Sequence, residues 1–229
     1  MCIKLALYAK CIMCFFFFLV ACNNKDERNS MYLKNAFEDL KSNRFSDAYK
    51  NANKAINIKS DNPTAFILRG RSSFEMGHLK IARKDFEYAL KLDVKNISAL
   101  YYLGLISYDL DDFNEAEIYF NKAIILKGTD SVYFESSNRF SEFTYDENVS
   151  MPELRFFRGL SYYYMNQYKK AANDFIFVAS EDYNKGECYF YIGAMALDEK
   201  NNVLACKYLN LALENGYKEA SKYLSHACN

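Results

Sequence analysis

A 34-residue period of small side chains constrains the fold of this chain more than any other feature of its sequence. A glycine or alanine recurs at steps of 34, 34, 55 and 34 residues, and an alanine follows each of them twelve positions later. The step of 55 exceeds the period by 21, which indicates an insertion between the third and fourth units. Such a period predicts a repeat protein whose units pack on their neighbours. The two series are Ala36, Gly70, Gly104, Gly159 and Gly193, and Ala48, Ala82, Ala116, Ala171 and Ala205.

The apolar residues inside each period predict two helices joined by a short turn. Leu100, Leu103 and Gly104 have the spacing of one helix, and the spacing of a second is shown by Ala116, Tyr119, Phe120 and Ala123. Small residues on facing helices let two backbones approach to roughly 8–10 Å, and the phenylalanine fills the space beside them. We therefore expect Gly104 to lie at a helix crossing. Because Ala36 occupies the equivalent position in the first unit, we expect Gly104→Ala to be tolerated.

Two helix-start signals fall at the beginnings of predicted units. Pro63 follows Asn62, in the order of an N-cap and a first-turn proline. Ser150 and Glu153 have the spacing of a capping box, in which each side chain bonds the backbone of the other residue. Both signals support a boundary between one helical hairpin and the next.

A unit with Leu-Gly in its first helix, Ala after the turn, and an aromatic residue before a second Ala resembles the tetratricopeptide repeat. The match is nearly complete around Leu103-Gly104 and weakest in the first unit, where Asn35-Ala36 replaces Leu-Gly. The resemblance implies an all-α, right-handed superhelical solenoid over residues 31–219, with a C-terminal capping helix over 220–229. The units are predicted at 29–62, 63–96, 97–130, 152–185 and 186–219. The insert at 131–151 is rich in apolar residues, so either an ordered excursion or a surface loop fits it.

The N-terminus has the pattern of a targeting segment. Residues 1–21 contain two lysines, no acid and an apolar run at 12–21, which is too short to span a bilayer. Leu19-Val20-Ala21-Cys22 resembles the lipobox of bacterial lipoproteins, and that resemblance implies cleavage before a lipidated Cys22. Residues 22–30 then form a polar tether, and Asn23 in place of Asp favours the outer membrane of the cell envelope. An ordinary signal peptide or an uncleaved anchor is the alternative.

The charge balance bears on which ligand class we expect, and the cysteine content bears on which disulfides can form. The chain has 29 basic and 29 acidic residues, so no basic excess predicts nucleic acid binding. Cleavage before Cys22 would leave Cys188, Cys206 and Cys228 beside it, enough for one disulfide or for free thiols.

The sequence does not predict an enzyme. Its two histidines are His78, in a predicted turn, and His226, near the C-terminus, and neither has the neighbours of a metal site. Phosphate-binding glycine loops and nucleophile elbows are missing from the sequence, so we expect no cofactor and no metal.

In the family that the chain resembles, the first helix of each unit lines a concave groove. That resemblance places a set of mostly aromatic residues there, although any single ring could instead pack between repeats. Leu33, Phe37, Ser98 and Tyr102 replace the polar side chains that hold a terminal carboxylate in chaperone-binding members, so that ligand is not expected. The expected groove residues are Arg71, Phe74, Tyr101, Tyr108, Phe156, Tyr163, Tyr164 and Phe190.

Taken together, these features predict a lipid-anchored adaptor that holds a protein or peptide partner at an envelope complex. The alternative is a surface lipoprotein that binds a glycan or a host ligand, because tyrosine faces can stack on sugars as well as on peptides. The sequence does not identify the partner.

Overall fold

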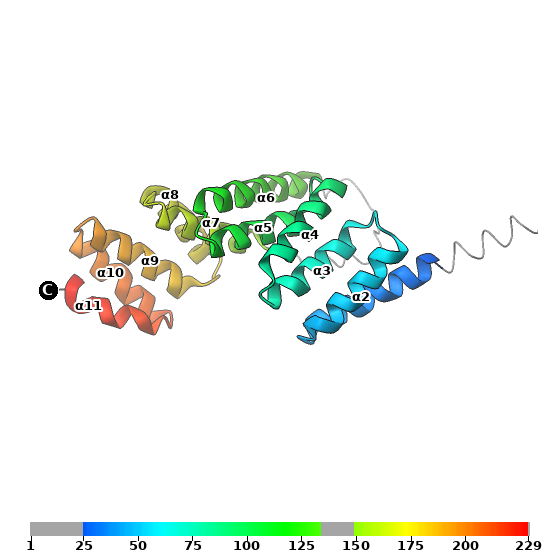
Figure 1. The fold of residues 1–229 in the computed structure, drawn as a ribbon. Coiled ribbons are helices and arrows are strands. Elements are labelled where there is room, and N and C mark those ends of the chain that lie inside the picture. The colour runs from blue at the N-terminus through cyan, green and yellow to red at the C-terminus, as the bar shows by residue number, and fades with distance from the viewer. Residues whose placement is uncertain (1–24, 134–148, 229) are drawn as a thin grey trace, which may run out of the picture. The chain divides into compact units, whose positions relative to one another are not determined.

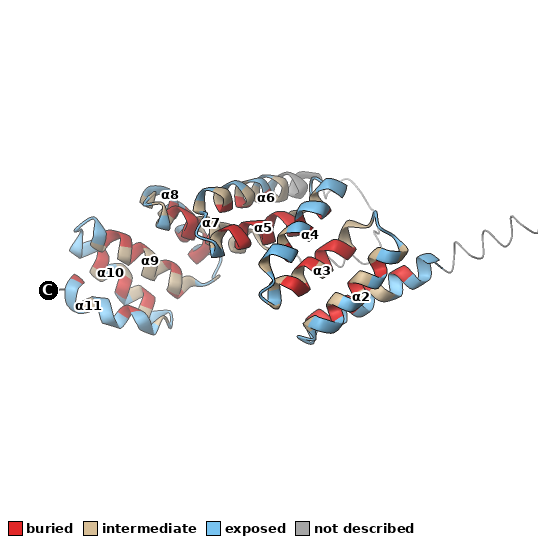
Figure 2. Cartoon of the chain, in the orientation of Figure 1, coloured by how far each residue is buried: buried red, intermediate tan, exposed pale blue. Residues whose placement is uncertain are grey.

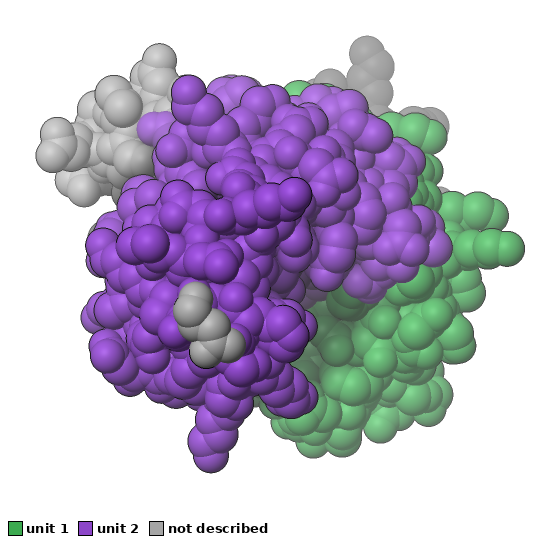
Figure 3. Space-filling view, turned by 90° about the vertical axis from the view of Figure 1, so that its left-hand side faces the viewer, with its two compact units in different colours: residues 1–94, 143–146 green, residues 95–142, 147–229 purple. Residues whose placement is uncertain are grey.

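A computed structural model of the chain describes residues 25–133 and 149–228, and every regular element in these ranges is a helix (Figure 1). The described residues divide into two compact units, residues 25–94 and residues 95–133 with 149–228 (Figure 3). Cys22 and the rest of the predicted targeting segment lie outside the described residues, and so does 134–148 of the predicted insert. In the described ranges, no helix is both long and apolar enough to cross a membrane.

The first unit contains two helical hairpins. Its helices are residues 25–41, α2 (Phe45–Ile58), α3 (Pro63–Glu75) and α4 (Leu79–Leu92). Ala36, Ala48, Ala52 and Ala55 are fully buried in the core between the first two helices and α3, which confirms that small residues sit where these helices meet. Gly77 ends the turn between α3 and α4 with a φ of +76°, a backbone conformation that glycine adopts without strain.

The predicted tether is wrong for residues 25–30, which are the first turns of a helix that runs to residue 41. Asn29 is buried, and its side-chain amide donates a hydrogen bond of 2.9 Å to the carbonyl of Ala55 in α2. Asn29 is polar and lies in a polar stretch, so no periodic pattern of apolar residues indicates in the sequence that it is buried. The first hairpin therefore begins earlier than the repeat pattern predicts.

The second unit contains three hairpins and a C-terminal cap. Its elements are α5 (Ile97–Asp109), α6 (Phe113–Tyr133), α7 (Met151–Tyr164), α8 (Tyr168–Ser180), α9 (Lys185–Asp198), α10 (Asn202–Glu214), the short 3-10 helix η1 (Lys218–Ala220) and α11 (Ser221–Ala227). Each helix packs on the next, and α7 also contacts both α5 and α9. The first helices of the hairpins (α5, α7 and α9) are thus neighbours. Buried residues line the facing sides of the helices (Figure 2).

Each glycine in the period lies against a large side chain of the second helix in its own hairpin. A Cβ added at Gly104 would lie 2.6 Å from Cε1 of Phe120, whose ring is fully buried. This confirms Gly104 as a crossing residue but overturns the expectation that Gly104→Ala is tolerated. Ala36 is accommodated because the first hairpin has Ala52 where the others have phenylalanine or leucine.

The predicted helix starts are confirmed, with one difference. The Asn62 side chain accepts a hydrogen bond from the backbone N–H of Thr64, and the Ser150 hydroxyl accepts one from the N–H of Glu153. The Glu153 carboxylate does not complete the capping box. It accepts a hydrogen bond of 2.6 Å from the hydroxyl of Tyr101 and thereby joins α7 to α5.

A disulfide bond holds the C-terminal cap. Cys206 in α10 is bonded to Cys228, which directly follows α11, and Ala220 and Ala227 of the cap are buried against α10. The predicted capping helix therefore exists as η1 and α11. The remaining cysteine of the unit, Cys188, is a buried free thiol, and burial raises its pKa to about 12.

Candidate binding surface

Tyrosine rings form a continuous row along the first helices of the second unit. Tyr108 of α5 lies 6.0 Å from Tyr164 of α7, Tyr164 lies 5.3 Å from Tyr163, and Tyr163 lies 5.0 Å from Tyr191 of α9, measured between ring centroids. We call Tyr108, Tyr163, Tyr164 and Tyr191 the aromatic face. All four are at least partly exposed, and Tyr164 is 47% exposed. Phe113, the first residue of α6, stacks on Tyr164 with 4.9 Å between ring centroids. This contact supports the row at Tyr164.

The structure separates the predicted groove residues into three groups. Tyr108, Tyr163 and Tyr164 belong to the aromatic face, which also contains Tyr191, a residue that the sequence analysis left out. Tyr101 and Phe156 are 7% and 4% exposed, so these two rings pack in the core and do not offer a surface to a partner. The remaining three predicted residues are only partly exposed. Arg71 and Phe74 lie on α3 of the first unit. The ring of Phe190 contacts the rings of Tyr217 and Tyr223 near the C-terminal cap.

Carboxylates accompany these tyrosines. Burial raises the pKa values of Tyr108, Tyr191 and Tyr217. The negative charge of Glu187, at the start of α9, adds to each of these shifts. Burial raises the pKa of Glu187 itself. No hydrogen bond or ion pair with another described residue is recorded for this carboxylate.

Two further carboxylates lie at the ends of α5 and α9. Asp109 follows Tyr108 at the end of α5, and burial raises its pKa. Asp198 at the end of α9 accepts a hydrogen bond of 2.8 Å from the hydroxyl of Tyr168, which raises the pKa of Tyr168 to about 12.

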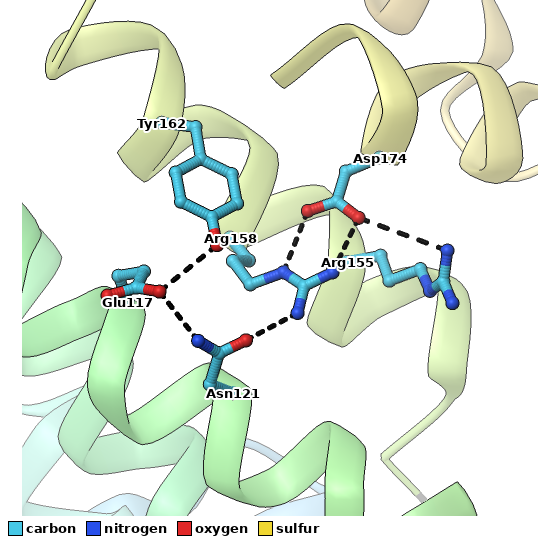
Figure 4. Close-up of polar contacts among 6 residues, drawn as sticks. All are labelled: Glu117, Asn121, Arg155, Arg158, Tyr162 and Asp174. Carbon is cyan, nitrogen blue, oxygen red and sulfur yellow. Dashed lines mark hydrogen bonds and ion pairs between the residues drawn. The ribbon is translucent and has the colours of Figure 1, made fainter. Parts of the chain in front are cut away.

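The arginines of α7 contact Asp174 of α8, and Arg158 also contacts α6 (Figure 4). Arg158 donates two hydrogen bonds, of 2.8 and 2.7 Å, to the buried carboxylate of Asp174 in α8, and a third to Asn121 in α6. Arg155 lies 3.9 Å from the same carboxylate. Glu117 of α6 completes the cluster by accepting hydrogen bonds from Asn121 and from Tyr162.

The first unit repeats this arginine arrangement. Arg69 of α3 donates two hydrogen bonds to Asp85 of α4, sixteen residues later, and a third to Asn53 of α2. Sequence analysis missed both clusters because it followed only the small and aromatic series. The signal was an Arg-Gly pair in the first helix and an Asp-Phe pair in the second, each present in the second and fourth units.

A cavity of about 310 Å³ opens between α8, α9 and α10. Most of its lining is apolar, and the lining also includes the charged residues Lys169 and Glu199. It shares no residue with the aromatic face. Its lining residues are Tyr168, Lys169, Ala172, Ile192, Met195, Ala196, Glu199 and Leu204.

These helices define an α-helical repeat protein, built within the described residues from five hairpins with a small residue at each crossing. Residues 67–131 match the family described as Tetratricopeptide repeat. A search of curated sequences finds no match to the chain.

Solved structures of low sequence identity share the fold. YrrB, described as a TPR protein with an unusual peptide-binding site, has a TM-score of 0.68 at 20% identity, covering 92% of this chain and 97% of its own. The MamA protein has a TM-score of 0.65 at 20% identity, covering 86% and 96%. PilF of Pseudomonas aeruginosa has a TM-score of 0.65 at 19% identity, covering 84% and 78%.

The chemistry available at the aromatic face is non-covalent. Partly exposed tyrosine rings can bury apolar area and donate hydrogen bonds, and carboxylates can pair with cations. In the ranges 25–133 and 149–228, no group of three or more His, Cys, Asp or Glu side chains could hold a metal ion.

Proposed function

We propose that this protein is a lipid-anchored scaffold that binds a polypeptide partner on the aromatic face of its second unit. The observation that carries the proposal is the row of partly exposed tyrosine rings that joins α5, α7 and α9. Aromatic rings dominate the binding energy of protein interfaces because they bury a large area with few rotatable bonds. The repeat fold suits protein–protein interaction, and such scaffolds typically have no enzymatic activity of their own.

The anchor is proposed from two independent features. The lipobox-like sequence ends at Cys22, where lipid would be attached. The Cys206–Cys228 disulfide favours an oxidising compartment, because disulfides persist outside the cytosol. Both features agree with a place in the bacterial envelope, and Asn23 favours the outer membrane.

Mass spectrometry of the N-terminus tests the anchor. We expect a processed chain that begins at acylated Cys22, and we expect Cys22→Ala to remain unprocessed. A processed chain that begins elsewhere and carries no lipid would refute this part of the proposal.

Crosslinking followed by identification of captured envelope proteins tests the binding surface. Tyr164→Ala should reduce capture strongly and change the melting temperature little, because its ring is 47% exposed. Tyr101→Ala is the matched packing control: it should lower the melting temperature, because its ring is buried. If Tyr164→Ala leaves capture unchanged while Lys84→Ala or Lys122→Ala on second helices reduces it, the partner binds another surface.

Glycan binding is the second candidate, because the same exposed rings could stack on sugars. A glycan array distinguishes the two functions. Binding to a defined glycan that Tyr164→Ala abolishes, together with no captured protein, would favour the glycan.

A further inference from the structure

Very little chain separates the first helix from the cysteine that is proposed to carry lipid. The helix is already formed at Lys25, and Cys22 lies three residues earlier in the sequence. Three residues span at most about 11 Å even when fully extended. The helix is also tied to its hairpin, because the Asn29 amide bonds the carbonyl of Ala55 in α2. A lipid on Cys22 would therefore hold this part of the first unit close to the membrane surface.

Four helix termini share the end of the first unit where the helix begins at Lys25. Short turns join the helix of residues 25–41, α2, α3 and α4, so each runs antiparallel to the next (Figure 1). The Asn62 amide, at the N-cap of α3, donates a hydrogen bond of 3.5 Å to the side-chain oxygen of Asn29. The ring of Phe66, in the first turn of α3, lies 4.4 Å from that of Tyr88 near the end of α4, measured between centroids. We call the surface of residues 25–31, 56–66 and 88–94 the anchor end.

Exposed apolar side chains concentrate at the anchor end. In the described part of the first unit, five large apolar residues are exposed, and four of these five belong to the anchor end. Val94, in the turn after α4, is 75% exposed, and Leu92 is the last residue of α4. Met31 and Tyr88 are the other two, whereas Ile81 lies at the start of α4 and thus at the opposite end. Single exposed apolar residues are ordinary, but a group of them beside a proposed lipid site favours contact with lipid.

From these observations, and resting on the proposed lipid at Cys22, we propose that the anchor end is a membrane-contact surface where Val94 and Leu92 enter the lipid interface. Apolar side chains that leave water for this interface gain free energy as they do in a protein core. The anchor end contains four basic and four acidic residues. Its charges therefore balance, so the contact depends on apolar burial and does not require anionic lipid.

A fluorophore that responds to lipid, attached at the anchor end, tests this surface. The full acylated chain with Val94→Cys is labelled with nitrobenzoxadiazole and reconstituted in vesicles of phosphatidylethanolamine and phosphatidylglycerol, with and without doxyl-labelled quencher lipid. The label should go to the new thiol alone, because Cys188 is buried and Cys206 is bonded to Cys228. We expect blue-shifted emission that the doxyl lipid quenches and that added salt leaves unchanged.

The matched control is Ile81→Cys, whose native side chain is 45% exposed at the opposite end of α4. Its label should keep the emission seen in water and should escape quenching. Equal quenching of both labels, or a Val94→Cys label that stays in water on acylated, vesicle-bound protein, would overturn the membrane-contact surface and leave the anchor intact. A blue shift that grows with protein concentration without quenching would place a second copy of the chain there and would also overturn it. A purified chain without lipid on Cys22 would refute the anchor, and this inference with it.

Discussion

Arg158 and Asp174 form a two-point ion pair between α7 and α8, and Arg69 and Asp85 form the same pair at the same sixteen-residue spacing in the first unit. The side chain of Asp174 is 4% exposed, so this buried carboxylate is paired with the guanidinium beside it. Each arginine also bonds an asparagine on the helix of the preceding hairpin. The pair therefore ties together three helices from two consecutive repeats.

Removal of Arg158 should destabilise the second unit strongly. Arg158→Met leaves a buried carboxylate whose remaining cation is the more distant Arg155, so we expect a loss of about 3 kcal/mol in the free energy of unfolding. Urea denaturation measures this loss. Lys84→Met, which removes an exposed cation, is the control and should change stability by less than about 0.5 kcal/mol. If Arg158→Met changed the free energy of unfolding as little as the control does, the ion pair would contribute little to stability.

Gly104→Ala should destabilise the protein, although alanine favours helix. The new methyl group would meet the buried ring of Phe120, and overpacking of this kind costs about 1–3 kcal/mol. On a Phe120→Ala background the same substitution should cost less, because that pair of alanines matches Ala36 and Ala52 of the first hairpin. Denaturant unfolding of the four chains of this cycle gives the coupling energy, and a coupling of zero would contradict the crossing geometry.

Loss of the Cys206–Cys228 disulfide should loosen the C-terminal cap. The bond links residues 22 apart, and closing a loop of that size stabilises a fold by about 3 kcal/mol in the chain-entropy model. Cys228→Ser should therefore increase hydrogen exchange in α10 and α11 while leaving α5 and α6 protected. Equal exchange in α11 with and without the bond would count against this role.

Cys188 should resist modification in the folded protein. Its thiol is buried and burial raises its pKa to about 12, so almost none of it is the reactive thiolate at neutral pH. Alkylation followed by peptide mass spectrometry should label this residue only after unfolding. Rapid labelling under native conditions would place Cys188 at an accessible surface.

Glu187 should make the folded protein less stable as the pH rises. Burial raises its pKa in the folded state, so the folded chain holds more protons than the unfolded chain between the two pKa values. Its contribution to stability is fully present below the unfolded value of about 4.3 and is lost as the pH rises through the folded pKa. Relative to the natural chain, Glu187→Gln should therefore be more stabilising at pH 7 than at pH 4, as thermal melts would measure. The same shift in Glu214→Gln would indicate a general charge effect.

The repeat architecture was visible in the sequence because it depends on spacing. Small residues at Gly70 and Gly104 recur at 34-residue steps, and they mark helix crossings wherever they occur. The spacing of the small residues does not indicate how closely the facing side chain approaches them. For this reason the sequence wrongly predicts that Gly104→Ala is tolerated, although Phe120 leaves no room for the added methyl group. The helical start at residues 25–30 was missed because its buried residue, Asn29, is polar and is held by a hydrogen bond, so no apolar period marks this segment.

The candidate surface was only partly predictable. Helix position correctly placed Tyr108, Tyr163 and Tyr164 on the first helices, but it could not separate them from Tyr101 and Phe156, which have the same spacing and are buried. Burial depends on which neighbours surround a ring, and those neighbours come from other hairpins. The hydrogen bond between Tyr101 and Glu153 joins residues 52 apart, across the insert, so no local pattern contains it.

The glycine contacts also bear on how such a chain can grow. Gly70 meets Phe86, Gly104 meets Phe120, Gly159 meets Phe175 and Gly193 meets Leu209, and both members of every pair belong to one hairpin. A hairpin that is duplicated, deleted or transplanted therefore takes its own tight fit with it. The arginine bonds to Asn53 and Asn121 reach into the preceding hairpin and do not travel in this way. A newly inserted repeat would bring its internal packing with it, while its fit to the hairpin before it would depend on contacts between hairpins, such as these arginine–asparagine bonds.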